Sequence, residues 1–300
     1  MTIRNFFSAA LFSNGFLLLA ASVQATPSDQ QPAESLVASR TTAVLQHNVS
    51  LLQVDDSNTL DASLLDSAAL ANAAKMPEVR MNPAVVKYVQ DYIKKNNEGL
   101  QKVEARSEPV FKIMEPILAK YNLPVELKYL AVVESDLKRT AVSRVGAVGA
   151  WQLMPATARE LGLKVNKKAD ERKHYYKSTT AAAKYLRDLY TVYEDWLLVI
   201  AAYNAGPGNI NKAIKKAGSR NFWKLQHFLP AETRGHVKRF IGTHYFFENA
   251  GSATTLTKAE NMAHAKKLEQ FAALQQSEVE MVKRVVAANL ESMFENEVFK

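Results

Sequence analysis

Residues 122–152 read NLPVELKYLAVVESDLKRTAVSRVGAVGAWQ. Pro124 has the fixed φ that suits a first helical turn. Three apolar residues lie seven, four and three positions before Glu134: Leu127, Leu130 and Ala131. This spacing places Glu134 on the apolar face of a helix over 124–135. A core-facing carboxyl group loses water, and desolvation favours its uncharged form. Glu134 is therefore a candidate general acid, and a solvated carboxylate at the helix end is the competing interpretation.

A loop with two glycines follows this helix. Its small and polar residues are Ser143, Gly146, Gly149 and Gln152. Two glycines three positions apart let the backbone pass close to a ligand or to another segment, and Gln152 offers both a donor and an acceptor. A generic turn explains the glycines equally well. The neighbouring Trp151 is more typical of a core than of a sugar-binding platform.

The segment WLLVIAAYNAGPG, residues 196–208, is an apolar helix that ends in a polar pair before a turn forced by glycine and proline. Tyr203 and Asn204 thus occupy the end of a buried helix, as Glu134 does. If the two helix ends meet, Tyr203 can hydrogen-bond the acid or its substrate. The alternative is a tyrosine whose hydroxyl has one buried structural partner.

The N-terminal region predicts export. A single positive charge and an uncharged, apolar run precede Ala25, which indicates a secretory signal peptide over 1–25. Residues 26–81 hold seven acidic residues against three basic ones, and we expect an acidic, flexible leader there. The catalytic domain is expected over 82–250 and a helical C-terminal extension over 251–300, with no stable membrane span after signal cleavage. The sequence has no cysteine, which excludes disulfides, thiolate zinc sites and cysteine lipidation.

Helical periodicity runs through almost all of the sequence after residue 82. The expected helices cover 83–95, 99–120, 124–135, 155–161, 178–193, 196–203, 207–217 and 231–249, with a tail pair at 257–275 and 277–294. Pro109 and Pro116 are expected to kink or split the second helix. The sequence thus predicts a mainly α, multi-helix domain whose helices bury a core and whose loops form a groove, followed by a helical tail.

The charge balance distinguishes the expected domain from its flanks. Residues 111–250 contain 23 Lys and Arg and 12 Asp and Glu, a net charge of +11. A basic, exported domain is attracted to an anionic envelope component such as a wall polymer or lipid headgroups. Nucleic acid is a disfavoured partner, because there is no recognition motif and aromatic residues do not interleave with basic ones.

Four motifs occur in order along the chain. They are Glu134-Ser135, then Ser143 with GAVGAWQ at 146–152, then AYNAG at 202–206, then Glu232-Thr233-Arg234. In order and spacing they resemble the lytic transglycosylases that share the goose-type lysozyme fold, with the membrane-bound D subgroup the most similar. Asp170-Glu171-Arg172 and Phe222-Trp223 also fit that pattern. The resemblance implies a lysozyme-like domain that acts on peptidoglycan glycan strands in the periplasm or elsewhere in the cell envelope.

The resemblance also implies roles for single residues. Glu134 matches the catalytic acid of the family. The matches to residues that contact the substrate or line its groove are Ser143, Gly149, Gln152, Tyr203 and Asn204. In the family the tyrosine of this set helps to position the acid and the sugar.

Two positions depart from the family pattern. Ala150 stands where leucine is common, so the wall of the groove is smaller there, and His236 stands where many relatives have tyrosine. The C-terminal peptidoglycan-binding repeats and the lipidated cysteine of many D-subgroup members do not occur in this sequence. Wall binding is therefore expected from the groove, the basic surface or an unknown envelope protein partner.

The chemistry follows from the number of acids. Cleavage of a β-1,4 glycosidic bond usually takes two carboxylates. Asp136 is two residues on and faces elsewhere if the helix continues, and Asp170 and Glu171 lie in a charged stretch expected to be solvated. A single acid suffices if the substrate supplies the nucleophile, because the acetamido group of N-acetylmuramic acid can stabilise the oxocarbenium-like centre and its C6 hydroxyl can close a 1,6-anhydro ring.

This interpretation predicts a lyase that needs no metal and no organic cofactor. Two alternatives stay open from the sequence. One is a goose-type lysozyme-like hydrolase that uses the same acid and admits water, and the other is a non-catalytic peptidoglycan-binding protein.

Overall fold

The structure, a computed structural model, describes residues 76–298. Within this range the chain is helical apart from connecting loops and isolated β-bridges such as Val148 with Leu153. The predicted mainly α fold class is confirmed. None of the helices in this range combines the length and the apolar content that a membrane crossing requires. The predicted signal peptide, 1–25, and most of the predicted leader, 26–81, lie outside the described residues.

Helix α3, Pro83–Lys120, is continuous, so the predicted division into two helices is wrong. The Asn82 side chain caps it by accepting a hydrogen bond from the Ala84 amide at 2.9 Å. Both internal prolines lie within the helix. A buried stripe passes through the region of the expected break: Leu100, Val103, Ser107, Phe111 and Met114. Packing of this stripe against α6, Tyr175–Tyr193, and α10, Ala231–Glu248, outweighs the local cost of proline and glycine.

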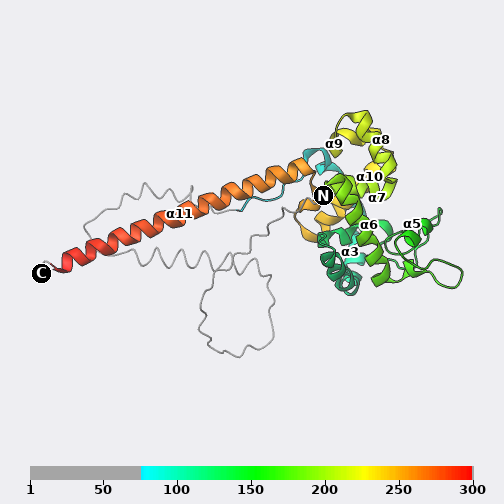
Figure 1. Cartoon of the computed structure of the whole chain (residues 1–300), viewed down its shortest axis with the longest axis horizontal. Helices are drawn as coiled ribbons and strands as arrows, with labels where there is room; N and C mark the ends of the chain where they lie inside the picture. Colours follow the sequence, from blue (N-terminus) through cyan, green and yellow to red (C-terminus); the bar gives the residue numbers. More distant parts are fainter. Residues whose placement is uncertain (1–75, 299–300) are drawn as a thin grey trace, which may run out of the picture. The chain divides into compact units, whose positions relative to one another are not determined.

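Helix α7, Trp196–Ala205, lies at the centre of the core. Its first seven residues are all buried, and a helix that is apolar on every side is stable only inside a protein. Helices α6 and α10 pack against it, as does α8, Pro207–Ala217, which follows it in the chain. Figure 1 shows α7 close to α6 and α10. The end of α7 is therefore held in place from several sides.

Helix α4, Lys128–Ser135, follows a 3-10 turn, η2 at Val125–Leu127, and carries Glu134 in its last turn. The predicted helix over 124–135 thus exists, with its first turn in 3-10 form. Its first five residues, Lys128 to Val132, are all buried, so this part of the helix is enclosed on nearly every side. The two residues after the helix have left-handed φ angles, 52° at Asp136 and 62° at Leu137, which turn the chain away directly after the acid.

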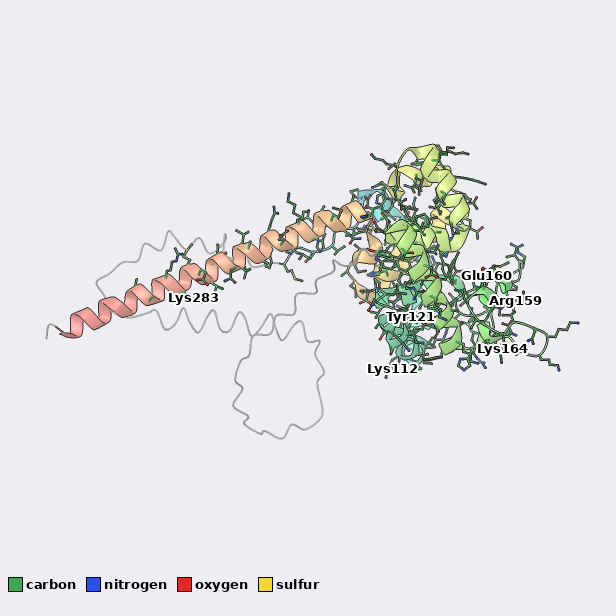
Figure 2. All side chains as sticks on the ribbon, viewed as in Figure 1. Lys112, Tyr121, Arg159, Glu160, Lys164 and Lys283 are labelled. Carbon is green, nitrogen blue, oxygen red and sulfur yellow. The ribbon has the colours of Figure 1, made fainter. Side chains whose placement is uncertain are left out.

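The remaining elements are short and lie in the connections. They are α5 (Pro155–Glu160), η3 (Glu171–Lys173), α9 (Phe222–Leu225), η4 (Gln226–Phe228) and η5 (Ala253–Thr255). Charged side chains project into solvent around α5, among them Arg159, Glu160 and Lys164 (Figure 2). The connections thus carry many of the polar groups, while the longer helices supply the core.

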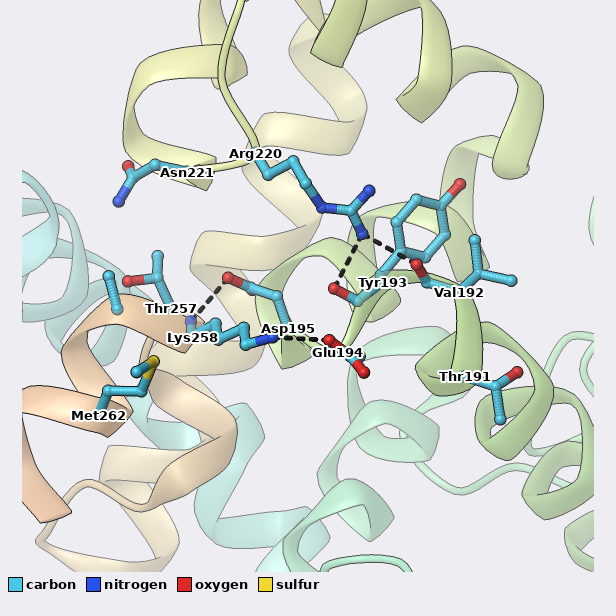
Figure 3. A pocket seen from close by; sticks show the side chains of 11 residues that line it. Thr191, Val192, Tyr193, Glu194, Asp195, Arg220, Asn221, Thr257, Lys258 and Met262 are labelled. Atoms are coloured by element: carbon cyan, nitrogen blue, oxygen red, sulfur yellow. Dashed lines mark hydrogen bonds and ion pairs between the residues drawn. The ribbon is translucent and has the colours of Figure 1, made fainter. Parts of the chain in front are cut away.

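Helix α11, Lys258–Val298, replaces the predicted pair of tail helices, because glutamine and serine at the expected break do not end a helix. Its first turn is attached to the residues between α6 and α7 (Figure 3). Asp195 accepts a hydrogen bond from the Lys258 amide at 2.7 Å, and the Lys258 ammonium lies 2.6 Å from the Glu194 carboxylate. These residues line a cavity of 660 Å³.

The histidine His244, on α10, is expected to make the fold sensitive to acid. Its residue surface is 1% exposed, and burial lowers its pKa from 6.5 to about 4, against the opposite influence of the Glu248 carboxylate. Between these two values the folded protein binds fewer protons than the unfolded chain. The contribution of His244 to stability is therefore present above pH 6.5 and is lost as the pH falls toward 4. The full loss is about 3 kcal/mol.

Urea unfolding of the parent and of His244→Gln between pH 7 and 4 measures this effect, because glutamine does not titrate. The comparison is needed because burial raises the pKa of Asp195 to about 6, and protonation of this carboxyl group favours folding as the pH falls from 6 to 3.8. We expect the free energy of unfolding of the parent, relative to the variant, to decrease by about 3 kcal/mol over this range. A difference that does not change with pH would contradict the expectation.

Candidate active site

Glu134 is sheltered at the end of α4, with its side chain 14% exposed. Its Oε1 atom lies 2.9 Å from Nε2 of His236 on α10, and the histidine side chain is 3% exposed. Among the residues that the structure describes, no carboxylate forms a hydrogen bond or an ion pair with Glu134. The acid is therefore paired with a histidine, which the sequence had marked only as a departure from the family.

The loop after the acid is folded by its own polar side chains. Ser143 Oγ accepts a hydrogen bond from the Ala147 amide at 2.9 Å. The Gln152 side-chain nitrogen donates to the carbonyl oxygens of Gly149 at 2.8 Å and Ala141 at 3.3 Å. The Ser143 hydroxyl can still donate and the Gln152 amide oxygen can still accept, so each keeps one group that suits a sugar.

Ser135 joins this loop to the end of α4. Its hydroxyl donates to the carbonyl oxygen of Ala150 at 2.9 Å. Because Ser135 follows Glu134 directly, this bond fixes the loop relative to the acid. The Glu-Ser pair found in the sequence therefore combines a candidate acid with a structural hydroxyl.

Arg172 holds the same loop from its other side. Its Nη1 donates to the carbonyl oxygens of Gly146 at 2.9 Å and Leu153 at 3.0 Å. The carboxylate of Asp170 pairs with Nη2 at 2.8 Å, and this arginine lowers the pKa of Asp170. The expectation that Asp170 and Glu171 are solvated is wrong, since their side chains are 20% and 18% exposed. The Asp-x-Arg spacing was the signal for this pair of a buried arginine and a half-buried carboxylate.

Gly149 lies where the loop touches the backbone of Arg172. Its φ is +88°, and an added Cβ would lie 2.9 Å from the carbonyl carbon of Arg172 and closer still to the carbonyl oxygen. Real Cβ atoms do not approach backbone so closely. The structure thus gives this glycine a packing reason beside the substrate contact that the family resemblance implies.

Tyr203 supports the loop from α7. Its hydroxyl donates to the carbonyl oxygen of Trp151 at 2.7 Å, and no hydrogen bond to Glu134 is formed. Burial and then the charge of Glu134 raise the pKa of Tyr203 well above its usual value, which keeps the hydroxyl a donor.

Trp151 is fully buried, and its Nε1 donates to Thr179 at 2.9 Å, which confirms the interpretation of Trp151 as a core residue.

Helix α10 links the ends of α7 and α4. Its Thr233 hydroxyl donates to the Asn204 side-chain oxygen at 2.9 Å, and His236, three residues on and on the same face, reaches Glu134. The Asn204 amide nitrogen is thus left to donate elsewhere. The sequence placed Thr233 in a motif, but it did not show which residues Thr233 and His236 contact.

Replacement of Tyr203 by phenylalanine is expected to weaken the support of this loop. The variant leaves the Trp151 carbonyl oxygen without its donor, which costs about 1–3 kcal/mol of unfolding free energy. Activity should fall by less than in a variant of the acid, because the hydroxyl bonds the loop and does not bond Glu134. Chemical denaturation measures the change in unfolding free energy, and lytic assays measure the change in activity. Tyr176→Phe, at a residue 55% exposed, is the control, and equal behaviour of the two variants would contradict the role.

Residues 112–226 match the family described as Transglycosylase SLT domain. The chain is 34% identical over 236 residues to the membrane-bound lytic murein transglycosylase D of Escherichia coli strain K12, a match that covers 76% of this chain and 50% of that protein. It is 27% identical over 191 residues to the membrane-bound lytic murein transglycosylase F of Salmonella choleraesuis, covering 57% of this chain and 34% of that protein.

Among solved structures, the 70 kDa soluble lytic transglycosylase of Escherichia coli is similar with a TM-score of 0.42 and 23% identity, covering 48% of this chain and 26% of that one. The chain thus spans about half the length, or less, of the relatives that it matches.

Proposed function

We propose that the chain is a peptidoglycan lytic transglycosylase of the cell envelope, on the premise that its residues 112–226 match the transglycosylase SLT domain. The observation that carries the proposal is Glu134, a sheltered acid at a helix end, beside a loop fixed by Ser135 and Tyr203 and without a bonded carboxylate in the described range. Such a site suits a reaction with one acid better than a reaction that needs two.

In the proposed reaction, the carboxyl group of Glu134 gives its proton to the glycosidic oxygen between N-acetylmuramic acid and N-acetylglucosamine. The bond from C1 to that oxygen breaks, its electron pair leaves with the oxygen, and the acetamido oxygen stabilises the positive C1. The C6 hydroxyl oxygen then bonds to C1, and its proton returns to the Glu134 carboxylate. The products are a free N-acetylglucosamine hydroxyl and a 1,6-anhydro end, and no water is consumed.

The proposed substrate contacts come from the loop and from the end of α7. Ser143 and Gln152 each keep one hydrogen-bonding group, and Asn204 keeps its amide hydrogens. In the proposal, Gly149 and Tyr203 shape the side of the substrate groove that carries these three polar residues. The net charge of +11 over 111–250 supports attraction to an anionic wall polymer. Export through the predicted signal peptide would place the enzyme in the periplasm.

Digestion of purified peptidoglycan sacculi in water enriched in ¹⁸O tests the proposal. We expect soluble fragments with 1,6-anhydro ends that carry no ¹⁸O from the solvent. Reducing ends that contain ¹⁸O would instead indicate a lysozyme-like hydrolase. Binding to sacculi without soluble fragments would indicate a non-catalytic binding protein. Either of these two results would reject the proposal.

A further inference from the structure

The ring of His236 has one bonded nitrogen and one isolated nitrogen. Nε2 lies 2.9 Å from Oε1 of Glu134, while Nδ1 is buried and has no hydrogen-bond partner among the described residues. The residue surface is 2% exposed. The proposed reaction does not yet assign any role to this ring.

A histidine ring can be doubly protonated, or neutral with its proton on Nδ1 or on Nε2. The unpartnered Nδ1 makes these three forms differ in free energy. A doubly protonated ring would bury an N–H donor on Nδ1 without an acceptor, and only the Glu134 carboxylate would compensate its charge. A neutral ring protonated on Nδ1 would bury an unpaired N–H donor. A neutral ring protonated on Nε2 leaves only a lone pair unsatisfied at Nδ1 and directs its N–H group at Glu134.

We infer that His236 is a positioning residue that holds Glu134 through a neutral Nε2–H donor, an inference that rests on the proposed function. The donor occupies Oε1, so the proton to be transferred sits on Oε2, the other oxygen of the carboxyl group. One contact thereby decides which oxygen faces the glycosidic bond.

The same contact favours the transition state over the starting state. While Glu134 is protonated, Nε2–H donates to a neutral carbonyl-type oxygen. As the proton moves to the leaving sugar, the carboxylate gains negative charge, and a hydrogen bond to a charged acceptor is about twice as strong. Since this stabilisation grows as the charge develops, it acts on kcat more than on KM. The bond stays in place while the carboxylate later removes the proton from the C6 hydroxyl.

Three substitutions at position 236 separate donor chemistry from packing. Glutamine places its amide nitrogen as many bonds from Cβ as Nε2, so it can keep the donor. Asparagine places its nitrogen where Nδ1 was, one bond short of Glu134, and leucine fills the space without a donor. With soluble glycan strands as substrate, we expect His236→Leu and His236→Asn to lower kcat by about 10- to 100-fold with little change in KM, and His236→Gln to stay within a few-fold of the parent.

If His236 had a purely structural role, the kcat values of the three variants would follow their melting temperatures. The presence or absence of a donor at position 236 would then make no difference. Unchanged kcat in a folded leucine or asparagine variant would therefore overturn the inference. If leucine prevents folding, the comparison of glutamine with asparagine decides the same question.

A second measurement is independent of activity. ¹⁵N NMR of the full chain distinguishes the two neutral forms of a histidine ring from the charged form, and the signal of His236 is the one that disappears in His236→Gln. We expect the neutral Nε2–H form in the parent. A charged ring or an Nδ1–H form would overturn the inference even if the enzyme is active. If the parent does not cleave peptidoglycan, the proposed function is rejected. The spectrum still shows which protonation form the His236 ring adopts beside Glu134.

Discussion

Glu134→Gln is expected to lower lytic activity on sacculi by at least about 10²- to 10⁴-fold, the usual contribution of general acid catalysis. Glutamine has the size of glutamate and cannot supply the proton. The loss should lie at the upper end of this range or beyond it, because the same carboxyl group acts as acid in the first half of the proposed reaction and as base in the second. Release of soluble fragments per unit time is the measurement.

The fold of this variant should be intact. The amide oxygen of glutamine can still accept the hydrogen bond from His236 Nε2, so the buried histidine keeps its partner. Equal melting temperatures for the parent and Glu134→Gln would show that lost activity reflects chemistry. Glu160→Gln, at an exposed position of α5, is the matched control and should retain the parent rate. Digestion by Glu134→Gln at the parent rate would reject this residue as the catalytic acid.

The helices predicted correctly from the sequence are those whose pattern is local. Helices α4 and α7 have apolar runs and clear ends, and the sequence placed both within a few residues. The continuity of α3 depends on its packing against α6 and α10, which no local pattern contains. Pro109 and Pro116, which were expected to kink or split the helix over 99–120, lie inside α3 at positions where tertiary packing overrides propensity.

The candidate site divides in the same way. The apolar spacing before Glu134 predicted its sheltered position, and the motif order predicted the loop and the end of α7 beside it. The contact between Glu134 and His236 joins residues 102 positions apart on two helices, and it follows from the crossing of those helices. Asp170 and Glu171 were misjudged because a run of charges usually lies in solvent. Here Arg172 donates to carbonyl oxygens of the loop and pairs with Asp170 beside it.

Gly149→Ala is expected to be among the most damaging single substitutions in the loop. The new Cβ would collide with the backbone carbonyl group of Arg172, and a residue with a side chain is strained at a φ of +88°. The strain and the overpacking together should lower the free energy of unfolding by about 3 kcal/mol or more. Chemical denaturation measures this loss. The Arg172 side chain also donates two hydrogen bonds to the loop, and a shift of its backbone would strain them.

Gly146→Ala separates the two causes, because Gly146 has nearly the same φ, +87°, but no atom lies within 4 Å of an added Cβ. This variant should lose only the conformational part, about 1–2 kcal/mol. The difference between the two variants then measures the close approach of the loop to Arg172. Lytic activity should follow the same order, because displacement of Gly149 moves Gln152, whose side chain bonds the Gly149 carbonyl oxygen. Equal stability of the two variants would contradict this account and would leave substrate contact as the reason for glycine at position 149.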